Sequence, residues 1–159
     1  MTSKDNRNGY RIEILLVEDN PADARLTELA LRDGKILIKL SIARDGVEAL
    51  AFLRKEGIHA KAKTPDFILL DLNLPKKDGR EVLMEIKGDV LIKHIPVAIL
   101  TTSDAESDIL YSYRMQANCY LVKPLELDRF VEMMNSIKSF WFATARLPRR
   151  DEISEPEYP

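Results

Sequence analysis

The stretch that decides the fold is Phe67-Ile68-Leu69-Leu70-Asp71, which continues into the loop Leu72-Asn73-Leu74-Pro75. Four consecutive apolar residues are typical of a strand that is buried on both faces, and the run ends in a carboxylate. A second run of this kind, Ile14-Leu15-Leu16-Val17, ends in Glu18-Asp19. Open α/β sheets place their ligands at the C-terminal ends of parallel strands, so the two acidic ends are predicted to share one site.

The rest of the chain alternates between strand and helix patterns. Five strands are expected, at residues 12–17, 36–42, 67–71, 96–101 and 118–122. Five helices are expected, the first between Asn20-Pro21 and Gly34 and the others at 45–53, 79–87, 104–115 and about 126–143. This alternation predicts an α/β fold, a doubly wound parallel sheet covered by helices on both faces. The folded domain is predicted at 11–145, between a flexible N-terminus at 1–10 and a mobile charged tail at 146–159.

Composition narrows the class of protein. The 159 residues carry a net charge of −2 with mixed signs, which gives no sign of nucleic-acid binding. No apolar run approaches the roughly 20 residues that span a bilayer, and the N-terminus lacks the apolar stretch of a secretion signal. The single Cys119 cannot form an internal disulfide, which suits a reducing compartment. A soluble cytoplasmic protein is expected.

The predicted C-terminal strand ends collect five side chains that suit phosphoryl chemistry: Glu18, Asp19, Asp71, Thr101 and Lys123. An aspartate carboxylate can attack phosphorus and form an acyl phosphate, so Asp71 is the candidate acceptor. Neighbouring carboxylates repel one another unless a cation lies between them. Lys123 would supply an ammonium to one phosphoryl oxygen, and the Thr101 hydroxyl would bind another.

The same carboxylates predict a metal site. Mg²⁺ suits a site that offers a few carboxylates, a backbone carbonyl and several waters. Glu18, Asp19 and Asp71 are the candidate carboxylate ligands, and the backbone carbonyl of Asn73 would complete the protein's share.

Taken in order, these motifs resemble those of the receiver domains of two-component response regulators, which are CheY-like proteins. The resemblance covers about residues 12–143. It rests on Val17-Glu18-Asp19-Asn20, Leu70-Asp71-Leu72-Asn73-Leu74-Pro75, Asp78-Gly79, Thr101-Thr102 and Tyr120-Leu121-Val122-Lys123-Pro124.

The resemblance implies a flavodoxin-like sheet with strand order 2-1-3-4-5 and phosphorylation of Asp71 by a partner histidine kinase in the presence of Mg²⁺. It also implies a switch in which Thr101 follows the phosphoryl group and Tyr120 turns inward. The expected protein is not an enzyme and acts through protein contacts. The residues after 143 are too few for a helix-turn-helix DNA-binding domain.

A narrower resemblance is to the single-domain regulators of cyanobacterial phytochromes, which implies a phytochrome kinase as partner. It rests on the long loop at 56–64, on Leu100-Thr101-Thr102-Ser103 and Asn118-Cys119-Tyr120, and on the ending Phe140-Trp141-Phe142-Ala143-Thr144-Ala145-Arg146-Leu147-Pro148.

Several alternatives stay open. Glu18-Asp19 could simply cap the following helix, where negative charges interact favourably with the positive end of the helix dipole. Thr102 competes with Thr101 for the phosphoryl contact. A phosphatase of the haloacid-dehalogenase type would also use an aspartyl phosphate. That class, however, expects a second acid two positions after the nucleophile, where this chain has Asn73. The remaining alternative is a scaffold that binds partners without phosphorylation.

The last helix carries more apolar residues than one buried face needs. Helical spacing predicts that Leu127, Phe130, Val131, Met134, Ile137 and Trp141 face the sheet, which leaves Met133, Phe140 and Phe142 for other faces. A large exposed apolar area usually has a partner. We therefore expect a homodimer through the region of Tyr111, Tyr113, Phe140 and Trp141, or a C-terminal tail that folds back over the same surface.

Overall fold

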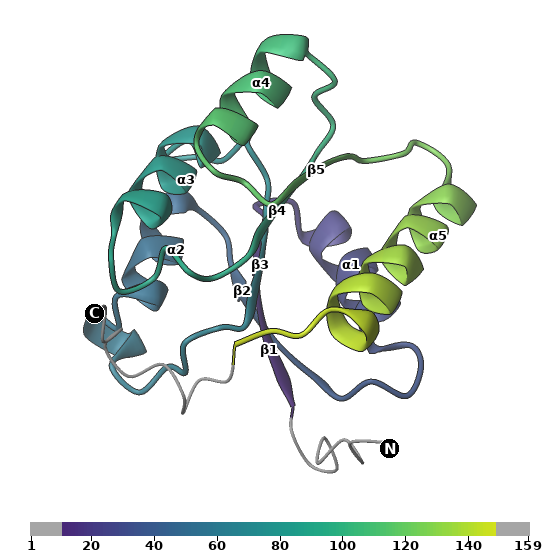
Figure 1. Ribbon diagram of the computed structural model, residues 1–159, viewed down its shortest axis with the longest axis horizontal. Coiled ribbons are helices and arrows are strands. Elements are labelled where there is room, and N and C mark those ends of the chain that lie inside the picture. Colours follow the sequence, from purple (N-terminus) through teal and green to yellow (C-terminus); the bar gives the residue numbers. More distant parts are fainter. Residues whose placement is uncertain (1–10, 149–159) are drawn as a thin grey trace, which may run out of the picture.

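A parallel sheet of five strands forms the centre of the molecule in the computed structural model, which describes residues 11–148 (Figure 1). The predictions for 1–10 and for the tail beyond 148 lie outside the described residues. The strands are β1 (Ile12–Val17), β2 (Ile38–Ala43), β3 (Phe67–Leu70), β4 (Val97–Thr101) and β5 (Cys119–Val122). Their order is β2-β1-β3-β4-β5 and all neighbours are parallel, which confirms the predicted fold.

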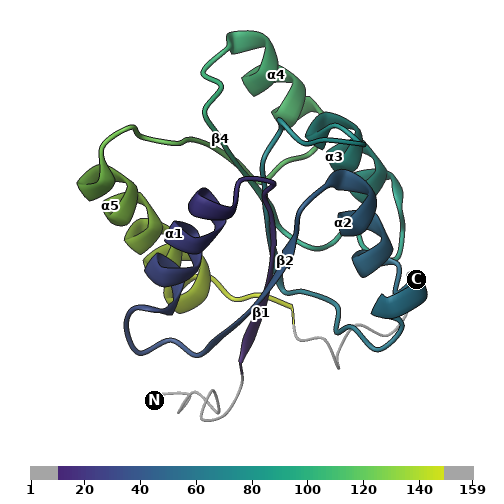
Figure 2. The same cartoon turned by 180° about the vertical axis from the view of Figure 1, so that it is seen from behind.

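Helices cover both faces of the sheet. The five helices are α1 (Pro21–Arg32), α2 (Gly46–Leu53), α3 (Gly79–Gly88), α4 (Glu106–Arg114) and α5 (Leu127–Ile137). Figures 1 and 2 show α1 and α5 on one face and α2, α3 and α4 on the other. The loop predicted at 56–64 contains one short 3₁₀ helix, Gly57–His59. No helix in the described part, 11–148, is long and apolar enough to cross a bilayer.

The apolar runs of β1 and β3 supply side chains to two cores. Leu15, Val17, Ile68 and Leu70 belong to the core under α2 and α3. The residues between them, Ile14, Leu16, Phe67 and Leu69, belong to the core under α1 and α5. Because successive side chains of a strand point to opposite faces, a central strand must be apolar at every position, which is the pattern that predicted the fold.

The first two helices begin at side-chain caps. The side chain of Asn20 accepts a hydrogen bond from Asp23 N at 3.0 Å, and Asp45 accepts one from Glu48 N at 2.8 Å. Glu48 in turn reaches back to accept from Arg44 N at 3.0 Å. These caps determine the residue at which each helix begins, next to the edge of the sheet where the acidic residues lie.

The predicted faces of the last helix are partly wrong. α5 ends at Ile137, and residues Lys138–Thr144 form a π-helical segment, in which the Ala145 N–H donates to the Phe140 carbonyl five residues earlier. A wider turn shifts the buried position that follows Ile137 from Trp141 to Phe142. Phe142 is therefore buried against Phe67, at a ring-centroid distance of 5.2 Å. Trp141 is half-buried, and its ring also lies 5.2 Å from Phe67, so its predicted contact with the core is present although it is not the fully buried position.

The start of α5 also differs from the predicted pattern. Leu127 and Val131 are exposed, at 56% and 36%, although their spacing predicted that they face the sheet. Phe130, Met134 and Ile137 are buried as predicted, so the apolar stripe that α5 buries is narrower than expected. Leu147, which was placed in the tail, packs against the core under α1 and α5.

Candidate phosphoryl-acceptor site

Three strands end in the charged residues that the sequence singled out. The backbone ladder runs one residue past each strand: Glu18 N donates to Ala43 O at 2.9 Å, and Asp71 N donates to Val17 O at 3.1 Å. Lys123 N donates to Thr101 O at 2.7 Å in the same way. The side chains of Glu18, Asp71 and Lys123 are thus placed by rigid strands rather than by loose loops.

The Lys123 ammonium links two of the carboxylates. Its Nζ lies 2.8 Å from Glu18 Oε1 and 3.1 Å from Asp71 Oδ2. Glu18 is 3% exposed and Asp71 9% exposed, so both charges are largely removed from water. The site therefore holds two buried carboxylates against a single buried cation.

This imbalance changes the acidity of the three groups. Burial, and then the neighbouring Asp71, raise the pKa of Glu18 to about 8 against the opposing effect of Lys123. Burial alone would raise the pKa of Asp71, but its Glu18, Lys123 and Asn73 neighbours lower it below the ordinary value. Burial would lower the pKa of Lys123, yet the two carboxylates raise it. Asp71 is consequently the anion and Lys123 the cation of the site.

The carboxylates fit a divalent cation. Glu18, Asp19 and Asp71 each offer an oxygen, and the three oxygens lie within 4.8 Å of one another. Asp19 is exposed, whereas Oε2 of Glu18 is buried and has no hydrogen-bond donor among the described residues. Asn73, the fourth predicted ligand, lies in the adjacent loop, and its N–H donates to Asp71 Oδ1 at 3.1 Å. An all-oxygen donor set with an unsatisfied carboxylate oxygen suits a hard cation such as Mg²⁺ or Mn²⁺.

A glycine holds the loop after Asp71 in place. A Cβ at Gly79 would lie 2.1 Å from the backbone carbonyl oxygen of Asp71 and 2.6 Å from Leu72 Cα. Asp78 beside it caps α3 by accepting a hydrogen bond from Arg80 N at 2.8 Å. The start of α3 can therefore press directly against the backbone of the acceptor residue.

Both predicted switch residues, Thr101 at the end of β4 and Tyr120 on β5, contact Ser103 in the loop after β4. Thr101 is fully buried and its Oγ1 accepts a long hydrogen bond, 3.5 Å, from Ser103 N. The half-buried Tyr120 donates its hydroxyl to the Ser103 carbonyl at 2.8 Å. Within the described residues the Lys123 ammonium contacts carboxylates rather than the Thr101 hydroxyl. Thr102 is exposed, so only Thr101 lies in the interior.

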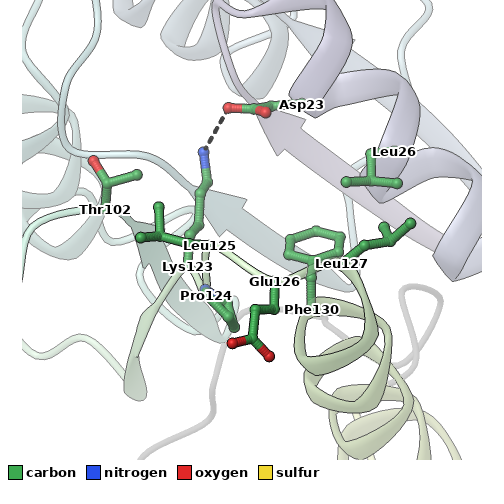
Figure 3. Close-up of a pocket in the computed structure, with 9 residues that line it drawn as sticks. All are labelled: Asp23, Leu26, Thr102, Lys123, Pro124, Leu125, Glu126, Leu127 and Phe130. Carbon is green, nitrogen blue, oxygen red and sulfur yellow. Dashed lines mark ion pairs between the residues drawn. The ribbon is translucent and has the colours of Figure 1, made fainter.

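Asp23 also lies at the site, although no sequence pattern indicated it. Its Oδ2 lies 3.6 Å from Lys123 Nζ, reached from the first turn of α1 (Figure 3). Asp23, Thr102, Lys123 and Glu126 form the polar part of a pocket of about 260 Å³, whose remaining lining is Leu26, Pro124, Leu125, Leu127 and Phe130.

Comparison with known proteins identifies the family. The response regulator receiver domain matches residues 14–135. The chain belongs to the response regulator receiver family. Receiver domains accept phosphoryl groups in two-component signalling. Membership of this family argues against the haloacid-dehalogenase alternative, which Asn73 also disfavours.

Individual relatives narrow the relationship. Response regulator Rcp1 of Synechocystis sp. is 50% identical over 135 residues, which cover 85% of this chain and 92% of Rcp1. The crystal structure of the Mn²⁺-bound form of Rcp1 matches with a TM-score of 0.84, 49% identity, and coverage of 87% and 99% of the two chains. The phosphorylated cyanobacterial phytochrome response regulator RcpA matches with a TM-score of 0.86, 50% identity, and coverage of 88% and 100%. The predicted likeness to cyanobacterial phytochrome regulators is thus confirmed.

Proposed function

We propose that Asp71 accepts the phosphoryl group of a phosphohistidine presented by a sensor histidine kinase. The observation that carries this proposal is the contact of the buried Asp71 carboxylate with Lys123 inside a cluster of further carboxylates. A lowered pKa keeps Asp71 ionised at neutral pH, as a nucleophile must be. The family supplies the reaction, and the geometry supports Asp71 as the residue that performs it.

The transfer makes one bond and breaks one. A carboxylate oxygen of Asp71 attacks phosphorus, the bond from phosphorus to the histidine nitrogen breaks, and the imidazole leaves with that electron pair. The product is an acyl phosphate. The protein's contribution is charge neutralisation, and Lys123 can move from its carboxylate partners to a phosphoryl oxygen of the product.

We assign Mg²⁺ to Glu18, Asp19, Asp71 and the backbone carbonyl of Asn73. When bound, a divalent cation neutralises the charge of the phosphoryl oxygens. Oε2 of Glu18 supports the assignment, because it is buried without a hydrogen-bond partner among residues 11–148 and an unpaired polar atom is costly in the interior. The Mn²⁺-bound form of Rcp1 shows that a similar chain takes such an ion.

Thr101 and Tyr120 form the proposed switch. The Thr101 hydroxyl would donate to a phosphoryl oxygen, and any movement of Thr101 would pull on the loop that follows it. Ser103 lies two residues later and its carbonyl is the acceptor of the Tyr120 hydroxyl. A change at the site would therefore alter the environment of Tyr120 on β5.

The acceptor is tested by mass. The protein is incubated with acetyl phosphate and Mg²⁺ and weighed intact, and a gain of one phosphoryl group is expected. Asp71→Asn should gain nothing, whereas the control Asp104→Asn, which changes an exposed aspartate near β4, should behave as the wild type. Absence of any gain in the wild type would defeat the assignment of Asp71.

The proposed partner is a kinase of the phytochrome type, and the proposed location is the cytoplasm. Likeness to RcpA, a phytochrome response regulator, supports the partner. A phosphotransfer panel against phytochrome and other histidine kinases tests it by initial rate. Fastest transfer from a kinase that is not a phytochrome would contradict the proposal. Output is proposed to be by protein contact rather than by catalysis on another substrate.

We further propose a homodimer through the surface around Tyr111, Tyr113, Phe140 and Trp141. Tyr113 is 48% exposed and Phe140 56% exposed, and the Phe140 and Trp141 rings lie 5.2 Å apart edge to face. An exposed aromatic cluster of this kind favours association. Sedimentation at tens of micromolar should show a dimer that Phe140→Ala weakens and Leu29→Ala, an exposed residue of α1, does not. A wild-type monomer with and without phosphorylation would contradict the dimer.

A further inference from the structure

A path of hydrogen bonds leads from α3 to α4 outside the phosphoryl site. Arg80 forms a bidentate ion pair with the Asp108 carboxylate. Its Nε donates to Oδ1 at 2.8 Å and its Nη2 donates to Oδ2 at 2.8 Å. Its remaining Nη1 lies 3.1 Å from both oxygens of Asp78, the residue that caps α3. Paired bonds between planar groups fix orientation as well as distance, so α4 is held to α3 at a defined angle.

Asp108 also reaches the loop between β4 and α4. Ser103 donates its hydroxyl to Asp108 Oδ2 at 2.6 Å. The backbone of Ser103 contacts both proposed switch residues: its N–H donates to Thr101 Oγ1 and its carbonyl accepts from Tyr120. Ser103 therefore joins the end of β4, the middle of β5 and the first turn of α4.

The start of α4 depends on these contacts. α1, α2 and α3 each begin with a side chain that caps the helix, but the cap residue of α4 is Ala105, which offers no side-chain hydrogen bond. Instead, Ala105 N donates to the Ser103 hydroxyl at 3.4 Å. The Arg80 and Asp108 side chains are only 30% and 17% exposed, so their ion pair is less weakened by water than a surface pair.

We propose that Arg80 and Asp108 are positioning residues that couple α4 to the state of the phosphoryl site through Ser103. The inference rests on the proposed function of Asp71. Movement of Thr101 on phosphorylation displaces Ser103, and Ser103 carries the displacement to Asp108 while Arg80 provides the fixed point on α3. Without the pair, α4 loses its link to the site although Asp71 still accepts the phosphoryl group.

The experiment compares amide hydrogen exchange in α4 with and without acetyl phosphate and Mg²⁺, while intact mass records phosphorylation in each sample. The variants are Asp108→Asn, Arg80→Lys and Ser103→Ala. Arg80→Lys keeps the positive charge but loses the bidentate pair with Asp108. Ser103→Thr keeps the hydroxyl and serves as the rescue of Ser103→Ala. Glu28→Gln is the matched control, because it breaks ion pairs of α1 with Arg25 and Arg32, away from this path.

All variants are expected to gain one phosphoryl group. The wild type, Glu28→Gln and Ser103→Thr should show a phosphorylation-dependent change of exchange in α4. In the three uncoupled variants that change should fall by roughly 2- to 30-fold, the range expected when coupling residues are altered. A purely structural role would speed exchange equally in both states and leave their ratio unchanged.

The outcomes separate the two proposals. If the wild type gains mass and the variants keep its full exchange ratio, the coupling role of Arg80 and Asp108 is overturned while Asp71 remains the acceptor. If the wild type gains mass and α4 does not respond at all, the coupling role is likewise overturned. If the wild type gains no mass, the proposed function fails and the inference falls with it.

Discussion

Lysines that are buried or half-buried have opposite kinds of partner at the two ends of the sheet. At the C-terminal ends of the strands, Lys123 lies among carboxylates, and one buried oxygen of Glu18 has no donor within residues 11–148. At the other end, Lys138 donates to the carbonyls of Ala30 and Asp33 at 2.7 and 2.6 Å and closes the end of α1. The first arrangement leaves carboxylate oxygens available to a ligand, whereas in the second the ammonium and the carbonyls are paired with one another.

Lys87 repeats the second arrangement. Its Nζ donates to the carbonyls of Lys93 and Ile95 at 3.0 and 2.8 Å and to Asn118 Oδ1 at 3.4 Å, where β4 and β5 begin. At the N-terminal end of the sheet, the lysines hydrogen-bond to backbone carbonyls and stabilise the fold. At the C-terminal end, the carboxylates outnumber the lysine that they contact. Substitutions at the two ends should therefore separate stability from phosphorylation.

The largest expected effect on stability is at Phe142. Phe142→Ala should lower the free energy of unfolding by about 3–5 kcal/mol, because it opens a cavity beside Phe67 in a well-packed core. Phe140→Ala, two residues earlier but exposed, should change it little. Urea unfolding curves measure both, and equal losses for the two variants would contradict the π-helical register.

Lys138→Met should have the next largest effect. It leaves two carbonyls at the end of α1 without their donor, at an expected loss of about 2 kcal/mol in the free energy of unfolding. The gain of mass from acetyl phosphate should be unchanged. The exposed Lys39→Met is the control, and a variant that remained fully stable but could not be phosphorylated would reverse the proposed division of the two ends.

Asp71→Asn should act in the opposite direction. It removes the negative charge that helps to raise the pKa of Glu18, so Glu18 can ionise more readily beside Lys123. Without divalent cation the free energy of unfolding should therefore rise by about 1 kcal/mol. Chemical unfolding in a chelating buffer checks the sign. A loss of stability would show that the Asp71–Lys123 pair stabilises the fold more than the crowding of carboxylates opposes it.

The smallest effect is a pH dependence at Lys87. Burial lowers the pKa of Lys87 from 10.5 to about 8. Between these values the unfolded chain binds a proton that the folded chain has lost, so the free energy of unfolding rises with pH. The slope is at most about 1.4 kcal/mol per pH unit. The hydrogen bonds of the ammonium favour the charged form, so we expect a total rise of about 1 kcal/mol relative to Lys87→Met. A difference between the two proteins that is flat from pH 7 to pH 10 would contradict the shift.

Sequence patterns predicted the fold and the central site because both depend on local signals. Strands that are apolar at every position can only be central, and charged residues directly after them must meet at one edge. For that reason Glu18, Asp71 and Lys123 come together as expected. Asp23 was missed because its contact with Lys123 depends on the distance between α1 and β5, which no local pattern gives.

Two other features also depended on tertiary structure. The Arg80–Asp108 pair joins residues 28 positions apart on two helices, and in the sequence each resembles an ordinary surface charge. The face of the last helix was misassigned because a constant helical period was assumed, whereas packing against Phe67 accompanies a wider turn after Ile137. Spacing rules predict a helix, but they do not predict a change of helix type within it.

The π-helical segment has a consequence for insertions and deletions. In a regular α-helix the residue four places after Ile137 would be buried, but here it is the residue five places on, so this turn holds one residue more than an α-helical turn. Removing Ser139 or Phe140 would let the helix continue regularly with Phe142 still on Phe67. It would also change which aromatic side chain points outward. The composition of the outer surface near Phe140 can therefore be altered by the length of this segment, with Ile137, Lys138 and Phe142 kept in the chain.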